Sequence, residues 1–595
     1  MEQSMEWDLS NLYKGYDDPK YESDLKKIYE LVDNAPKMMK SLDKNNLKDS
    51  VEAYLKYDEE INVLSGGLFS FSSLQLSTNV NDTKSQSEIA KLQIKFQELV
   101  PLNVAFSKFI KNVNLDELCS KSKYLDEYKF YLENIQKSAK HMLSDKEEML
   151  YAKLQMVASD SWGDLQSKLT SNIKIKVEGI DDELPLSSVR NLAYDNNPEI
   201  RKNAYEAELK AYKQIDEAVA MGLNNIKREA NIMANMRGYK SILDMSVKQS
   251  NMTKKTLDAM ISAIKQELPK FRKYYKLKAK ALGYKKGLPF YEIFAPMGKL
   301  TKTYTYNEAK EEVLSVYKSF SDSLYNMGKR AFEENWIDVL PHEGKVGGAF
   351  CSNQQQIKES RVLTNFTGQL SDIQTLAHEL GHAYHGHVIS ENKPLNWGYP
   401  MPLAETASIL CQTMMSKKLI AEFSDPFEKL TVVENSLQED TQCVVDILSR
   451  FLFENKVCNT PIDTPLSSND MCNLMIEAQK ESYGNGLDQD NLHPYMWLCK
   501  SHYYNASYNF YNWPYAFGLL YGRGLYALYQ INKEEFVKNY DQMLRNTGMM
   551  SVEAVAKGMN IDVTKKEFWL LSLKSIEEDI DLFEDLLKKT NENFK

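Results

Sequence analysis

The residues best suited to chemistry are two histidines and a glutamate in one apolar stretch. The segment 371–385 reads Ser-Asp-Ile-Gln-Thr-Leu-Ala-His-Glu-Leu-Gly-His-Ala-Tyr-His and contains His-Glu-x-x-His at His378, Glu379 and His382. On a helix, side chains four residues apart lie on the same face, so both imidazoles can bind one metal ion. Zinc accepts imidazole nitrogen readily. Glu379 follows the first histidine, so it can hold a metal-bound water without being a ligand.

Chance explains this pattern poorly. The chain has only 8 histidines in 595 residues, and four of them fall within 378–387. A random His-Glu-x-x-His is roughly a one-in-a-hundred event in such a chain, and the helical setting adds support. We expect Ser371 or Asp372 to cap this helix at its N-terminus.

A catalytic zinc ion needs a third protein ligand and one position for water. A longer pattern with a third histidine at its eleventh position fails, because Val388 stands there. Glu405 lies 23 residues after His382 in a second apolar helical stretch. A lone glutamate on an apolar face is costly unless it is paired or bound to metal. Glu405 is therefore the favoured third ligand, and His385 and His387 rank below it.

The ligand set of two histidines and Glu405 predicts one Zn²⁺ per chain and amide hydrolysis. The ion would polarise a carbonyl and acidify its water, with Glu379 as general base. The resulting oxyanion needs a hydrogen-bond donor. The aromatic segment 502–518 offers candidates, which are His502, Tyr508, Tyr511 and Tyr515. With 35 tyrosines in the chain, this segment is a weak signal by itself.

Most of the remaining sequence reads as helix. Between 198 and 236 apolar residues recur at steps of three and four, which is one stripe on a helix that begins at Pro198 and ends before Gly238. Similar periodicity occurs in seven further ranges, which are 20–64, 82–137, 253–283, 306–334, 427–456, 534–546 and 565–589.

Strand signals are few. Residues 173–177 alternate between apolar and polar side chains. Residues 345–350 and 361–366 predict two neighbouring strands of a small sheet just before the histidine motif. The turn-rich stretch 180–197 suggests a boundary, which gives an N-terminal helical region 1–190 and a larger region 191–595.

Composition narrows the class of protein. The net charge of −10 argues against nucleic acid or anionic membrane as a partner. No stretch reaches the roughly 20 apolar residues of a membrane helix, and the N-terminus does not read as a secretory signal. Seven scattered cysteines without CxxC spacing indicate reduced thiols and a cytoplasmic setting. The oligomeric state is not readable.

Together these motifs match a known family. The chain resembles oligoendopeptidase F, in the thimet-oligopeptidase family of zinc metallopeptidases, over nearly its whole length. Five segments carry the resemblance, which are Trp7-Asp-Leu-Ser-Asn-Leu-Tyr13, Gly347-Gly-Ala-Phe-Cys351, Thr375-Leu-Ala-His-Glu-Leu-Gly-His382, Glu405-Thr-Ala-Ser408 and Phe510-Tyr-Asn-Trp-Pro-Tyr-Ala-Phe-Gly518.

The resemblance implies a mainly α, two-lobed protein with a deep central channel and a small β-sheet near the zinc site. It implies zinc held at His378, His382 and Glu405, with Glu379 as base. It implies that an edge strand near Gly348 and Ala349 pairs with an extended substrate.

The resemblance further implies that His502 and the tyrosines bind the substrate carbonyl. Here the match is looser, and His502 and Tyr511 rank before Tyr515 and Tyr508. The expected activity is cleavage of internal bonds in short unstructured peptides.

Other functions remain open at this stage. A metallocarboxypeptidase on a similar scaffold would need a cation for the terminal carboxylate, and Arg523 is only a loose candidate. A non-catalytic peptide-binding protein would tolerate loss of one metal-site residue, whereas all four are present. A purely structural helical scaffold would leave the clustered histidines unexplained.

Overall fold

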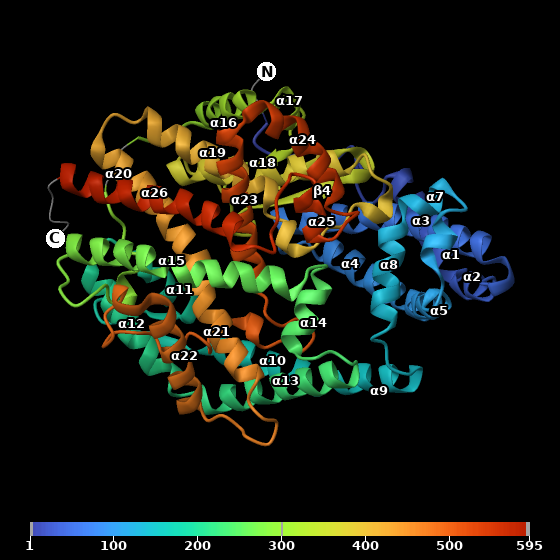
Figure 1. Ribbon diagram of the computed structural model, residues 1–595, viewed down its shortest axis with the longest axis horizontal. Helices are drawn as coiled ribbons and strands as arrows, with labels where there is room; N and C mark the ends of the chain where they lie inside the picture. The colour runs from blue at the N-terminus through green and yellow to red at the C-terminus, as the bar shows by residue number, and fades with distance from the viewer. Residues whose placement is uncertain (1–3, 299–301, 591–595) are drawn as a thin grey trace. The chain divides into compact units, whose positions relative to one another are not determined.

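The computed structural model describes residues 4–298 and 302–590. Helices dominate it, and the strands are short (Figure 1). The predicted mainly α class with a small sheet is confirmed.

The chain forms two compact units, each built from separate stretches of sequence. Unit 1 comprises Met1–Met142, Lys302–Met415 and Leu528–Asn560. Unit 2 comprises Leu143–Thr301, Ser416–Ala527 and Ile561–Lys595. The boundary predicted near residue 190 falls inside unit 2, and the division at that point stays a prediction. The central channel likewise stays a prediction.

The helix predicted from Pro198 to residue 236 is two helices. These are α12 (Pro198–Tyr212) and α13 (Asp216–Met236). Between them Ile215 has a φ of −129°, outside the helical range, and Asp216 and Glu217 place acidic side chains in the first turn of α13. Acidic residues there stabilise a new helix start. The apolar stripe continues across the break, which explains why periodicity alone does not reveal it.

Other predicted helices agree more closely with the structure. In unit 2, α15 (Lys254–Ala281) packs against α26 (Lys566–Thr590), which in turn packs against α20 (Pro426–Thr441) (Figure 1). Lys278 of α15 forms an ion pair with Glu434 of α20, and both side chains are fully buried. In unit 1, the predicted range 306–334 is α16 (Tyr306–Phe320) and α17 (Asp322–Glu333), because Ser321 caps a new start.

The predicted ranges 20–64 and 82–137 likewise divide into shorter helices. They contain α1 (Pro19–Asp33), α2 (Ala35–Lys40), α3 (Leu47–Thr78), α4 (Thr83–Phe96), α5 (Val100–Ile110), α6 (Leu115–Cys119), α7 (Lys123–Glu127) and α8 (Lys129–Ala139).

The small sheet of unit 1 has the strand order β3-β5-β4. Strand β3 (Ile337–Asp338) is parallel to β5 (Glu359–Leu363), and β4 (Phe350–Gln354) is antiparallel to β5. The strand predicted over 345–350 is therefore mostly wrong, since pairing begins only at Phe350. Gly348 adopts a φ of +80°, which a regular strand does not accommodate.

The strand predicted at 361–366 begins and ends earlier than expected. In unit 2, the alternating segment 173–177 forms β1 (Lys174–Lys176), as predicted. Its antiparallel partner β2 (Glu183–Pro185) lies in the turn-rich stretch 180–197, where no strand was predicted.

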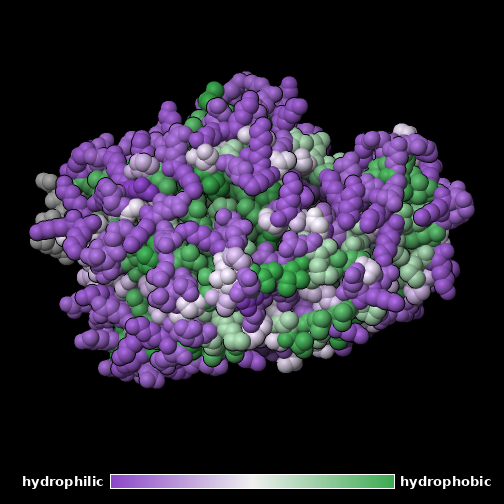
Figure 2. Space-filling view, turned by 60° about the horizontal axis from the view of Figure 1, so that its bottom comes forward, coloured by the Kyte–Doolittle hydropathy of each residue, from purple (hydrophilic) through white to green (hydrophobic). Residues whose placement is uncertain are grey.

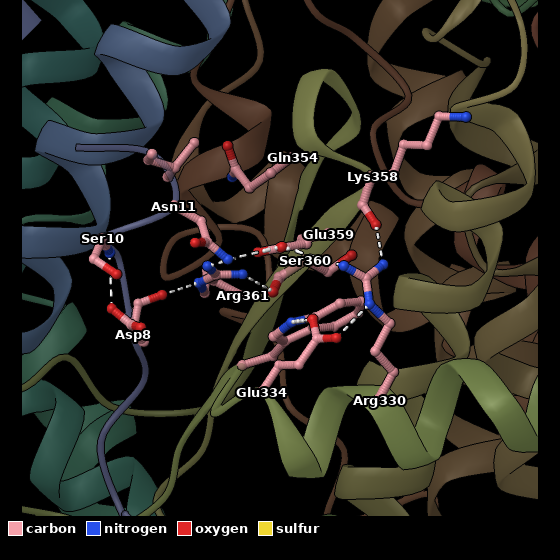
Figure 3. A network of polar contacts seen from close by, with 12 residues as sticks. Asp8, Ser10, Asn11, Arg330, Glu334, Gln354, Lys358, Glu359, Ser360 and Arg361 are labelled. Atoms are coloured by element: carbon pink, nitrogen blue, oxygen red, sulfur yellow. Dashed lines mark hydrogen bonds and ion pairs between the residues drawn. The ribbon is translucent and has the colours of Figure 1, made fainter. Parts of the chain in front are cut away.

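The N-terminal segment of unit 1 is bound to β5 by a buried ionic network. The Arg361 side chain is fully buried, and its Nη2 lies 2.9 Å from Glu359 Oε2. Arg361 Nε donates to the Asp8 carbonyl oxygen at 2.6 Å, and Asn11 Nδ2 donates to Glu359 Oε1 at 2.9 Å. Figure 3 shows the guanidinium between Asp8 and Glu359. Trp7 packs edge-on against Phe350 at the start of β4. The motif around Trp7 therefore supports the sheet.

We predict that Arg361→Met lowers the free energy of unfolding by about 2 kcal/mol, because the buried Glu359 carboxylate loses its partner on β5 and keeps only Arg330 and Asn11 among the described residues. The urea midpoint of the purified chain measures the change. Lys358→Met is the matched control, since Lys358 is exposed. Equal midpoints for the two variants would contradict this role for the network.

Candidate metal centre

The histidine motif lies on α18 (Leu370–Ile389), and the start of this helix is well capped. The predicted cap residues are shifted, because Gln369 is the N-cap and Asp372 is the third helical residue. Asp372 Oδ2 accepts hydrogen bonds from the backbone N–H groups of Gln369 and Thr367, at 3.0 and 2.7 Å. Asp372 thus closes a capping box and fixes the first turn of the helix.

The rest of α18 is buried against the sheet and several helices, which include α16 and α17. It packs on β4 and β5, and on α24 (Lys533–Asn546) of the same unit. Tyr384 donates a hydrogen bond to Asp541 of α24. These contacts fix the rotation of α18 about its axis, and therefore the direction of its side chains.

The structure brings His378, His382 and Glu405 together. One ligand atom from each lies within 4.8 Å of the other two. Each Nε2 is 3.3 Å from Glu405 Oε2. Two imidazoles and a carboxylate form a known donor set for catalytic zinc, so these residues fit the ion. Within the described residues this is the one group of histidine, cysteine and acidic side chains with such spacing.

Gly381 is the reason that Glu405 can reach the histidines. A Cβ at this position would lie 2.7 Å from Ser408 Cα and 2.8 Å from the Ala407 carbonyl oxygen. Both atoms belong to the backbone of α19 (Thr406–Glu422), which begins directly after Glu405. The missing side chain therefore lets α19 approach α18 closely.

Two further residues orient the ligands. Gln412 Oε1 is 2.8 Å from His378 Nδ1, so Nδ1–H donates, and once Nε2 is deprotonated its lone pair faces the metal position. Ser408 Oγ donates to Glu405 Oε2 at 2.7 Å. Neither residue is among the site residues predicted from the sequence. Their spacing of three and then four from Glu405 puts all three on one helix face, which is the signal that was available.

Electrostatics keep the carboxylate of Glu405 ionised. Burial alone would raise the pKa of Glu405, but hydrogen bonds from His378 and His382 lower it. Burial alone would lower the pKa of His378, whereas the hydrogen bond and charge of Glu405 raise it to about 9. Burial raises the pKa of Glu379, and the two neighbouring histidines offset part of the rise. A higher pKa makes a carboxylate a better proton acceptor.

The rival ligands His385 and His387 lie outside this group. His385 is fully buried, and its Nε2 is 2.8 Å from Thr547 Oγ1. Its ring stacks on Tyr399 with 4.1 Å between centroids. Burial lowers the pKa of His385 to about 3 and that of His387 also falls. His385 therefore serves as a neutral packing residue.

Gly348 and Ala349 lie in the loop that leads into β4, at the edge of the sheet. Asn365 Nδ2 donates to the carbonyl oxygens of Val346 and Gly348, at 3.0 and 2.8 Å, and so fixes the loop. Among the described residues, no heavy atom lies within 4 Å of a Cβ built at Gly347 or Gly348. The glycine pair is therefore open to a ligand.

The predicted donor residues cluster in unit 2. Tyr511 and Tyr515 share a hydrogen bond of 2.6 Å between their hydroxyl groups. Tyr511 stacks on His502 and meets Tyr508 edge-on. Asn512 Nδ2 is 2.6 Å from His502 Nε2, which places the ring proton on Nδ1. Burial and the charges of nearby Arg450 and Lys500 lower the pKa of His502 to about 3, so the ring stays neutral.

Arg523 is engaged elsewhere. It is 3% exposed and pairs with Asp440 of α20 and Asp579 of α26. A guanidinium that already neutralises two buried carboxylates is a structural group of unit 2. The structure therefore removes Arg523 as a candidate for binding a substrate carboxylate.

Comparison with known families now places the chain. The model described as "Peptidase family M3" matches residues 191–575, and the model described as "Oligopeptidase F" matches residues 110–175. The first match covers more than half of the chain. The protein therefore belongs to peptidase family M3, and the resemblance noted in the sequence is confirmed.

Relatives match over nearly the full length. An oligoendopeptidase F homolog of Lactococcus lactis is 26% identical, with 99% of this chain and 98% of that protein covered. Oligopeptidase PepF of Bacillus subtilis is 24% identical, with 99% and 88% covered.

Solved structures share the fold. A Chlamydophila abortus protein superposes with a TM-score of 0.85 at 20% identity, with 98% of this chain and 99% of that chain covered. Oligoendopeptidase-F from Enterococcus faecium gives 0.70 at 17% identity, with 96% and 99% covered. Among the helices that the structure describes, none is long and apolar enough to cross a bilayer.

We predict that Gly381→Ala reduces bound zinc, because the added methyl group pushes α19 and Glu405 away from the histidines. Gly398→Ala is the matched control, since no heavy atom of the described residues lies near its Cβ position. Zinc per chain after dialysis, measured by inductively coupled plasma mass spectrometry, should fall at least tenfold for Gly381→Ala only. Full zinc content in both variants would contradict the proposed close approach.

Proposed function

We propose that this protein is a zinc-dependent endopeptidase that cleaves internal bonds of short, unstructured peptides. The observation that carries the proposal is the grouping of His378, His382 and Glu405, with the buried carboxylate of Glu379 beside them on α18. One Zn²⁺ per chain would be held by the two imidazoles and the Glu405 carboxylate. Bound there, the ion supplies Lewis acidity for a carbonyl group and lowers the pKa of water.

Glu379 moves the proton in this mechanism. Its carboxylate accepts a proton from the attacking water and then donates that proton to the leaving amine. Glu379 is 7% exposed, so bulk water competes little for its hydrogen bonds. His378 keeps the orientation that Gln412 gives it, and Ser408 holds the Glu405 carboxylate, so neither ligand needs to reorganise during the reaction.

The edge of the small sheet is the proposed platform for the substrate backbone. In the described sheet β4 is an edge strand, paired only with β5. An extended peptide can add to such an edge through main-chain hydrogen bonds. Gly348 has open space where a side chain would stand, and we assign it and the neighbouring Ala349 to the substrate backbone. Backbone pairing of this kind favours unstructured peptides and is largely independent of sequence.

The aromatic cluster of unit 2 supplies the proposed hydrogen-bond donors. His502 is neutral and carries its proton on Nδ1, and the hydroxyl groups of Tyr511 and Tyr515 are already hydrogen-bonded to each other. Tyr508 is 43% exposed and offers a further hydroxyl group. We assign these four residues to the substrate carbonyl and the oxyanion that forms from it.

Endopeptidase activity is favoured over carboxypeptidase activity. A carboxypeptidase would place a cation near its metal, and the candidate for that role, Arg523, is instead buried between Asp440 and Asp579. The names of the relatives, oligoendopeptidase F and oligopeptidase, agree with internal cleavage of oligopeptides. A peptide-binding protein without activity is disfavoured because Glu379 and all three ligands are present.

The remaining assignments follow from the same observations. We propose regions 1–190 and 191–595 as the family's N-terminal and catalytic parts, since the two family models end and begin near this boundary. We propose the cytoplasm as its location, because all seven cysteines are free thiols. Short peptides are the proposed partners, and nucleic acid is not among them.

The proposal predicts that peptides of about five to twenty residues are cut at internal bonds and that a zinc chelator abolishes the cuts. Mass spectrometry of a mixed peptide set gives the products. Glu379→Gln should keep its zinc and lose at least a thousandfold in kcat, because an amide cannot accept the proton. Single-residue losses from the C-terminus would favour a carboxypeptidase, and near-normal turnover by Glu379→Gln would refute the role of Glu379.

A further inference from the structure

A large apolar groove on unit 2 is not used by the mechanism above. It encloses about 680 Å³ between α9 (Asp145–Gln155), α10 (Ser159–Asn172) and α13. Leu150, Leu154, Ile232 and Met236 line it, and each of these side chains is about half exposed. Figure 2, in which the bottom of Figure 1 comes forward, shows hydrophobic side chains gathered on this side. A concave surface lined mainly by apolar side chains is the kind of place where ligands bind.

The groove also contains one cation that lacks an internal partner. Glu147 is engaged in the capping box of α9 with Ser144. Glu229 accepts hydrogen bonds from Tyr151 and from the backbone and hydroxyl group of Ser159. Both lining carboxylates are therefore satisfied. Arg228 is half-buried and lines the same groove, and its guanidinium forms no ion pair or hydrogen bond among the described residues.

The groove adjoins the segment to which we assign the carbonyl donors. Gln155, which lines the groove, donates from Nε2 to Ser507 Oγ at 3.0 Å. Lys227, next to Arg228 on α13, donates from Nζ to Asn509 Oδ1 at 2.7 Å. These two contacts flank Tyr508 in sequence. A peptide that touches Tyr508 therefore has the groove as a neighbouring surface within unit 2.

We propose that this groove binds the C-terminal end of the peptide substrate. Apolar side chains near the C-terminus lie on the floor, and the terminal carboxylate pairs with Arg228. A guanidinium binds a carboxylate through two parallel hydrogen bonds, and the α-carboxylate is the anion that every unmodified peptide carries. The inference rests on the proposed peptidase function and adds a preference to it, namely peptides with apolar C-terminal residues and a free carboxylate.

Binding to the full-length, zinc-loaded Glu379→Gln chain tests the inference without turnover. The probes are two N-terminally labelled nonapeptides of one sequence that ends in Leu-Leu, one with a free C-terminal carboxylate and one with an amide. Fluorescence anisotropy should give at least tenfold tighter binding of the acid. Adding Arg228→Gln should remove that difference, whereas adding Lys285→Gln, an equal charge change on an exposed loop, should preserve it. Equal affinity for acid and amide before any groove substitution would overturn the proposal.

The apolar floor has its own matched pair of variants. Ile232→Asn and Met221→Asn both place an amide on an exposed position of α13, but only Ile232 lines the groove. Ile232→Asn should weaken binding of the Leu-Leu peptide about tenfold and leave a Ser-Ser peptide unchanged, and Met221→Asn should change neither. Equal effects of the two substitutions would overturn the inference. The inference would also be overturned if the parent chain sedimented as a dimer and Ile232→Asn dissociated it, because a second copy would then occupy the groove.

Steady-state kinetics of the chain with Glu379 intact separate this inference from the function on which it rests. If internal cleavage occurs and the ratio of KM for the acid to KM for the amide is the same before and after Arg228→Gln, the groove does not bind the carboxylate. That result would leave the proposed peptidase function intact. Absence of any cleavage by zinc-loaded protein would refute the peptidase and the groove's role together. Internal cleavage with a tenfold rise in KM for the acid alone supports both.

Discussion

The metal centre depends on one close contact, the approach of α19 to α18 at Gly381. Two histidines one turn apart define a line along α18, but a third ligand must come from another element. Gly381 lies between them and has no side chain, so the backbone at Ala407 and Ser408 lies where a methyl group would stand. The carboxylate of Glu405 reaches both imidazoles only because of this contact. Gln412 and Ser408 then fix the ligands from the same helix.

The surroundings of α18 hold this contact in place. The helix packs on β4 and β5, and β5 carries the buried Arg361, which is tied to the N-terminal segment. The same sheet thus carries the β4 edge that we propose for the substrate and supports the helix that bears Glu379. This arrangement explains how the motif near residue 7 supports a site centred near residue 380, because that motif contacts the sheet on which α18 packs. Packing and hydrogen bonding position the site, while the reactive groups themselves are few.

Features that depend on residues close together in the sequence could be predicted from the sequence. The histidine spacing, the isolated Glu405 and most helices follow from periodicity and from the cost of burying charge, and the structure brings the three proposed ligands together. Residues 345–349 were misread as strand because Gly348 takes a positive φ that apolar patterning does not reveal. The break at Ile215 and the two discontinuous units depend on contacts distant in sequence. Gln412 and the groove around Arg228 likewise become visible only when elements are packed.

The central claim is that His378, His382 and Glu405 hold one zinc ion, and X-ray absorption spectroscopy at the zinc edge tests it most directly. For the stoichiometric zinc protein, the account predicts two imidazole nitrogens at about 2.0–2.1 Å and carboxylate or water oxygens at about 2.0–2.2 Å, with no sulfur. Glu405→Ala should lose the ion on dialysis. A spectrum that requires a third imidazole or a thiolate, or full zinc retention by Glu405→Ala, would contradict the account.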